Sequence, residues 1–92
     1  MRQIDAVLLA DELDKLGVRA EAYEGLGLWA VIIRTDTGRK HCSVINDLVT
    51  ITWGSMWEHC ARHEGFPEHA APKIAHTLPP TCFKRRNRGP KS

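Results

Sequence analysis

Histidine and cysteine side chains gather in the second half of the chain, where they could serve metal binding or nucleophilic catalysis. The candidate ligands are Cys60, His63, His76 and Cys82, and the spacing of Cys60 and His63 would place both on one face of a helix. Zinc would suit a small domain that needs a cross-link. The spacings match no paired set of ligands, however, so we favour a buried thiol with surface histidines and predict no metal and no cofactor.

A cysteine nucleophile needs an imidazole beside the thiolate and a third group that orients the imidazole. Cys42 follows His41 directly, but neighbours on a strand point to opposite faces. Cys60 and His63 are better spaced, yet no known nucleophile motif surrounds them, and a chain of 92 residues is small for a substrate cleft. We therefore predict that the protein is not an enzyme.

A dense run of cationic side chains ends the sequence and could neutralise phosphates. Residues 1–83 hold eight Lys and Arg against eleven Asp and Glu, a net charge of −3, whereas residues 84–92 carry +5. Flexible basic arms of this kind bind nucleic acid without reading its sequence. The candidate contacts are Lys84, Arg85, Arg86, Arg88 and Lys91. The alternative is a solvated terminus that only adds solubility.

The composition is that of one globular domain, with 42% apolar and 26% charged residues. The longest apolar run, Leu28 to Ile33, is far shorter than the roughly 20 residues of a spanning helix, and no uncharged signal segment opens the chain. We therefore expect a cytoplasmic protein that does not enter the membrane. Its three cysteines are then expected to be reduced thiols.

Helical periodicity opens the chain and strand periodicity follows. Residues 3–16 are predicted to be a helix with Gly17 as its left-handed cap and Val18 in contact with Leu13. Its apolar stripe consists of Ile4, Val7, Leu8, Leu9, Leu13 and Leu16. Alternation predicts a strand over 18–23, and an apolar run predicts another over 28–35. A hairpin turn leads to a strand over 40–46, and 49–53 is either a fourth strand or a continuation of the third.

The remaining chain is predicted to hold a second helix, a strap and a tail. Ser55 and Glu58 have the spacing of a capping box, and Gly65 followed by Pro67 would end the helix that they begin. Residues 67–83 contain four prolines and predict an irregular strap, with one helical turn starting at Pro72. Residues 84–92 are expected to be disordered when unbound. The α+β domain itself is predicted to span residues 1–66.

These elements predict an α+β fold of the order α-β-β-β-(β)-α. The economical packing is an antiparallel meander of three to four strands with both helices on one face. The segment 28–33 is apolar on both faces, however, so its second face needs a cover. The strap is our first expectation for that cover, followed by a second copy of the chain and then by another partner.

Two resemblances accompany this reading of the residues. The segments Leu8-Leu9-Ala10-Asp11-Glu12-Leu13, Gly17-Val18 and Tyr23 to Val31 resemble small uncharacterised proteins of actinobacteria, many of which sit on plasmids, prophages and other mobile elements. This resemblance, over residues 6–34, implies a cytosolic accessory role near nucleic-acid transactions. The element order over residues 3–65 is similar to that of the double-stranded RNA-binding domain. The start of the last helix lacks that domain's basic residues, so no function is carried over.

The sequence thus favours a small non-catalytic accessory or regulatory protein. Its body would bind a protein or itself through the sheet face, and its tail would contact nucleic acid non-specifically. One alternative is an adaptor or inhibitor with no nucleic-acid role, in which the acidic first helix meets a basic partner. The other is a zinc-stapled domain.

Overall fold

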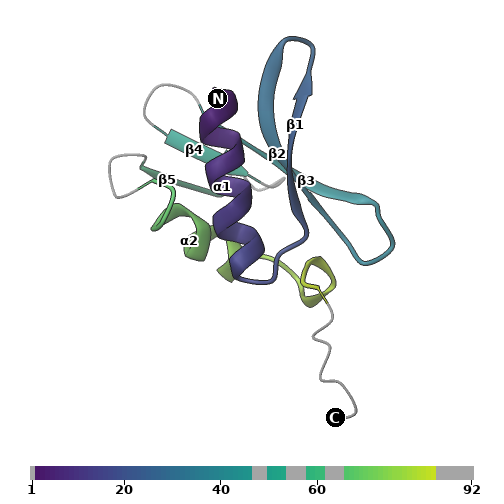
Figure 1. Ribbon diagram of the computed structural model, residues 1–92. Coiled ribbons are helices and arrows are strands. Elements are labelled where there is room, and N and C mark those ends of the chain that lie inside the picture. Colours follow the sequence, from purple (N-terminus) through teal and green to yellow (C-terminus); the bar gives the residue numbers. More distant parts are fainter. Residues whose placement is uncertain (1, 47–49, 54–57, 62–65, 85–92) are drawn as a thin grey trace.

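The computed structural model describes residues 2–46, 50–53, 58–61 and 66–84, and within them the fold is α+β, as the sequence predicts. The elements are α1 (Gln3–Lys15), β1 (Ala20–Gly25), β2 (Leu28–Arg34), β3 (Lys40–Asn46), β4 (Thr50–Trp53), β5 (Glu58–Ala61), α2 (Ala70–His76) and the 3₁₀ helix η2 (Pro80–Cys82). The strands form one antiparallel sheet in the order β1-β2-β3-β4-β5, which is the expected meander with β5 added to the predicted three to four strands (Figure 1).

Helix α1 ends in the cap that the sequence predicts. Gly17 has a φ of +87°, a conformation that other residues adopt only at a cost. Its N–H donates to the carbonyl of Asp14 at 2.9 Å, and the N–H of Val18 donates to the carbonyl of Leu13 at 3.0 Å. These are the two hydrogen bonds of a Schellman motif. Val18 and Leu13 are both fully buried in the core, so the end of α1 is fixed against the start of the sheet.

The buried face of α1 differs in part from the predicted apolar stripe. Leu9 and Leu13 are fully buried, and the other buried residues of α1 are Ala6, Ala10 and the charged Asp5. Four members of the stripe are exposed instead, namely Ile4, Val7, Leu8 and Leu16. Ala6, Leu9, Ala10 and Leu13 follow the same spacing of three and four residues. Two of these four residues are alanines, whereas the large side chains of Ile4, Val7, Leu8 and Leu16 are exposed.

The helix predicted over 55–65 is wrong where the structure describes it, because Glu58–Ala61 forms β5. This strand pairs with β4 from Thr50↔Ala61 to Trp53↔Glu58. A capping box is a local signal worth about 1 kcal/mol, whereas pairing along the sheet satisfies the backbone groups of both strands. The ends of the predicted helix, residues 55–57 and 62–65, lie outside the described residues.

The second helix lies in the segment predicted to be an irregular strap. Helix α2 contributes Ala70, Ala71 and Ile74 to the core, and η2 contributes Cys82. The predicted helical turn at Pro72 is therefore part of a two-turn helix that starts at Ala70. Figure 1 shows α2 beside the C-terminal half of α1, which it contacts. Within the described residues, neither helix has both the length and the apolar character that crossing a membrane requires.

One face of the sheet carries the core, and we call it the inner face. Register places Val31 opposite Val44 and Ile33 opposite Cys42, and all four side chains are buried. They belong to the same cluster as Leu9 of α1, and the buried residues of α2 and η2 belong to it too. The strap therefore covers the same face as α1. Our expectation that it covers the second face is wrong.

Candidate functional site

The predicted metal ligands do not come together in the described part of the chain. Cys82 is fully buried in the core, whereas His76 is exposed on α2. Burial raises the pKa of the Cys82 thiol, so the protonated, unreactive form is favoured. Cys60 belongs to β5, its side chain is not described, and His63 lies outside the described residues. Among the side chains that are described, no three His, Cys, Asp or Glu groups are placed to hold a metal ion.

The predicted basic tail starts from a fixed point on the body. The N–H of Lys84 donates to the carbonyl of Gly17 at 2.6 Å, and Phe83 pairs with Val18 in a β-bridge. The ammonium of Lys84 forms an ion pair with Asp14 near the end of α1. The other predicted contacts, Arg85, Arg86, Arg88 and Lys91, lie outside the described residues. The tail therefore leaves the body beside the C-terminal end of α1.

The second face of the sheet, which we call the outer face, is open and apolar. A groove of about 570 Å³ lies along β1, β2 and β3 on this face. The residues that line this outer groove include Tyr23, Leu26, Leu28, Ile32, Lys40 and Ile45. Ile32 is buried at its floor, but Tyr23 is 51% exposed, Leu28 69% and Ile45 46%. The sequence predicts that this second face needs a cover, and α1, α2 and η2 do not provide it.

Leu26 stands out at the tip of the β1–β2 hairpin. Leu26 and Gly27 both have positive φ, +57° and +79°, as a two-residue type I′ turn requires. Asn, Asp and Gly adopt this conformation readily, whereas leucine adopts it only at an energetic cost. The Leu26 side chain is also fully exposed. This position therefore carries a backbone cost and a solvation cost together, and neither serves the fold of the hairpin.

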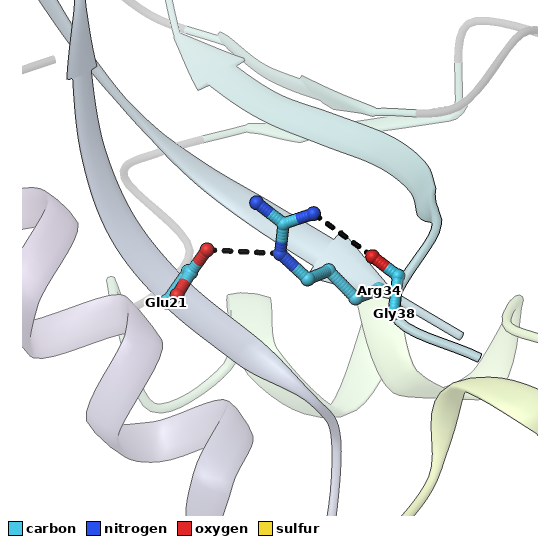
Figure 2. Close-up of polar contacts among 3 residues, drawn as sticks. All are labelled: Glu21, Arg34 and Gly38. Carbon is cyan, nitrogen blue, oxygen red and sulfur yellow. Dashed lines mark hydrogen bonds and ion pairs between the residues drawn. The ribbon is translucent and has the colours of Figure 1, made fainter. Parts of the chain in front are cut away.

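A charged cluster lies at the other end of β1 and β2. Arg34 donates from Nε to Glu21 Oε2 at 2.9 Å and from Nη1 to the carbonyl of Gly38 at 3.0 Å (Figure 2). Arg34 thereby joins β1 to the turn that precedes β3. A second cavity, of about 210 Å³, is lined here by Arg19, Ala20, Glu21, Arg34 and Lys84. We call it the cationic cavity because three of its five lining residues are cations.

The sequence predicts the outer groove only in part, and it does not predict the cationic cavity. The apolar character of residues 28–33 on both sides predicts that the outer face needs a cover, but it does not single out Tyr23 or Ile45. A leucine at position 26, between two glycines of a hairpin turn, was the missed signal, since a polar residue is expected there. Arg19 and Arg34 were missed because they meet Lys84 only through the fold.

Comparisons with known proteins add nothing to this geometry: no protein-family model matches the chain, and neither a curated protein nor a solved structure matches it. The resemblance to proteins of actinobacterial mobile elements stays a prediction.

Proposed function

We propose that this protein is a non-catalytic accessory protein whose body self-associates through the outer groove and whose basic tail contacts nucleic acid non-specifically. The observation that supports this proposal most directly is the uncovered apolar face of β1, β2 and β3. Large exposed apolar side chains in one continuous groove are typical of interaction sites.

The size of the apolar surface fits a second copy of the chain. The exposed fractions of Tyr23, Leu26, Leu28 and Ile45 amount to roughly 500 Å² per copy, taking about 150–200 Å² for each large side chain. Two copies that pack face to face would bury about twice that area. About 1,000 Å² is the area at which a specific interface becomes credible.

Sedimentation velocity on the full chain tests self-association, with Leu26→Asn as the informative variant. Asparagine tolerates positive φ, so this change should leave the hairpin as stable as before or more stable while it removes apolar area. We expect a dimer of the wild-type chain at concentrations up to about 100 μM and a monomer of Leu26→Asn at the same concentrations.

Leu8→Gln is the matched control, because Leu8 is exposed on α1 on the opposite side of the sheet from the outer groove. This variant should still dimerise. A wild-type monomer throughout the concentration range would refute the proposal. A dimer that is lost in Leu8→Gln but kept in Leu26→Asn would also refute it, because the interface would then be α1.

The tail is tested separately by fluorescence anisotropy with a single-stranded DNA oligonucleotide. Deletion of residues 85–92 removes four of the five tail cations and leaves the Lys84 contact with the body in place. Neutralising about four phosphates predicts a slope of roughly −3 for the logarithm of affinity against the logarithm of salt concentration. Binding that is absent at low salt, or unchanged by the deletion, would contradict the tail's role.

A further inference from the structure

The cationic cavity lies where three separate parts of the chain meet. Arg19 precedes β1, Arg34 ends β2, and Lys84 follows η2. The backbone holds them together, because the N–H of Arg34 donates to the carbonyl of Arg19 at 2.9 Å and the N–H of Arg19 donates to the carbonyl of Cys82 at 2.8 Å. The side chains are thus positioned by hydrogen-bonded backbone rather than by a loop.

Within the described part of the chain, two of the three cations that line the cavity form ion pairs with a carboxylate, and the third does not. Arg34 is paired with Glu21, and Lys84 is paired with Asp14. Arg19 has no carboxylate partner among the described residues, and its Nε is buried without a hydrogen-bond acceptor. A buried donor without a partner destabilises the folded chain, and more so when it belongs to a charged group. Arg19 is therefore the one cation of the three that has no ion-pair partner among the described residues.

We propose that the cationic cavity is a binding site for a phosphate group, with Arg19 as its principal ligand. A guanidinium matches two oxygens of a phosphate at once, and Arg19 is the guanidinium in this cavity that no carboxylate occupies. Arg34 and Lys84 line the same cavity and add positive potential, which Glu21 and Asp14 reduce in part. A volume of about 210 Å³ has room for a phosphate group, because one water molecule takes about 30 Å³ of liquid.

The phosphate group has two sources, a free inorganic phosphate or a phosphodiester of nucleic acid. The place of Lys84 makes the second source relevant, because Lys84 is the first residue of the predicted tail. A strand that the tail attracts would pass close to this cavity. Binding of inorganic phosphate does not depend on that idea, nor on self-association through the outer groove.

The test is a titration of the ¹⁵N-labelled full chain with inorganic phosphate, followed by NMR at constant ionic strength with chloride as the competing anion. We expect saturable shifts of the Arg19 and Arg34 signals with a dissociation constant on the order of 1 mM. Arg19→Gln should weaken binding by at least about tenfold. Its unfolding midpoint should equal or exceed that of the wild type, because a buried donor without an acceptor is removed and no ion pair of the described residues is lost.

Arg39→Gln is the control, since it makes the same change of net charge on an exposed turn residue that does not line the cavity. Binding of phosphate by this variant should be unchanged. The proposal is overturned if the shifts do not saturate, or if the two variants weaken binding equally, because net charge alone would then explain the effect.

A second titration with a short single-stranded oligonucleotide separates the two sources. If Arg19→Gln weakens oligonucleotide binding more than Arg39→Gln does, the cavity accepts a phosphodiester. If only the binding of inorganic phosphate falls, the cavity accepts the free anion. Deletion of residues 85–92 should leave inorganic phosphate binding unchanged, so failure of the tail proposal and failure of the cavity proposal are distinguishable.

Discussion

Replacement of Ile74 by alanine is a direct test of how the C-terminal segment is attached to the body. Ile74 of α2 is fully buried in the cluster that also contains Leu9 of α1 and Val31 of β2. The change removes three carbon atoms, which is worth about 2.4 kcal/mol of transfer free energy at roughly 0.8 kcal/mol for each. The cavity left behind adds to this loss, so we expect a total of about 3 kcal/mol.

That loss is large compared with the stability of so small a chain. A domain of this length has a free energy of unfolding on the order of 5–14 kcal/mol. Urea denaturation followed by tryptophan fluorescence measures the difference. With a slope of about 1.5 kcal/mol per M, the midpoint of Ile74→Ala should fall by about 2 M. If this variant does not fold, Ile74→Val should still show a loss of about 0.5–1.5 kcal/mol.

His76→Ala is the matched control, because His76 is exposed on the same helix. Its free energy of unfolding should stay within about 0.5 kcal/mol of the wild type. If Ile74→Ala changes stability no more than His76→Ala does, then α2 does not pack on the inner face. In that case the strap would be free to cover the outer face, and the main support for self-association would be lost.

Two further outcomes follow from the local geometry. Gly17→Ala should lower the free energy of unfolding in urea by about 1–2 kcal/mol, because φ is +87° at this position, and Gly17→Asn should lower it less. The added Cβ would lie 3.8 Å from Phe83 Cδ2, which is an ordinary contact, so a steric clash does not explain the loss. Equal losses for the two variants would contradict a backbone cause. Burial raises the pKa of the Cys82 thiol in the folded chain. As pH rises above the ordinary thiol pKa of about 8.5, the unfolded chain therefore releases this proton first. The contribution of the buried thiol to the free energy of unfolding is complete below that pH and is lost above it. The free energy of unfolding should therefore fall more steeply between about pH 8 and pH 10 in the wild type than in Cys82→Ala, and parallel curves would contradict the shift.

The parts of the fold that the sequence predicts well are those set by local signals. The Schellman motif after α1 depends on Gly17 and its neighbours alone, and it is present as predicted. The turn at Gly38 and the bounds of β3 are likewise local, and Lys40–Asn46 is confirmed at both ends. A short run of apolar residues predicts β2, and the segment predicted as a fourth strand or a continuation of the third forms the separate strand β4.

The predictions of secondary structure are wrong where contacts with residues distant in the sequence determine the structure of a segment. The segment 58–61 carries a helix-start signal, but β4 pairs with it and makes it a strand. The segment 70–76 begins without a side-chain cap on its backbone, and its helix is held by the burial of Ala70, Ala71 and Ile74 against the rest of the core. Neither pairing nor burial is visible in a local window of sequence. The cationic cavity was missed for the same reason, since Arg19, Arg34 and Lys84 are far apart in the chain.

The main core cluster lies on the inner face, and this makes the outer face informative. Val31, Ile33, Cys42 and Val44 pack in one cluster with α1, α2 and η2, whereas the large side chains of Leu28 and Ile45 stay exposed on the other side. Polar residues at Leu28 and Ile45 would be compatible with the same strands, as they are in sheets with one solvated face. Leu26 is less favourable still than Leu28 and Ile45, because its backbone has a positive φ and its side chain is also exposed. Side chains that carry such costs without serving the fold are most simply explained by a contact outside it, and the outer groove is where that contact would form.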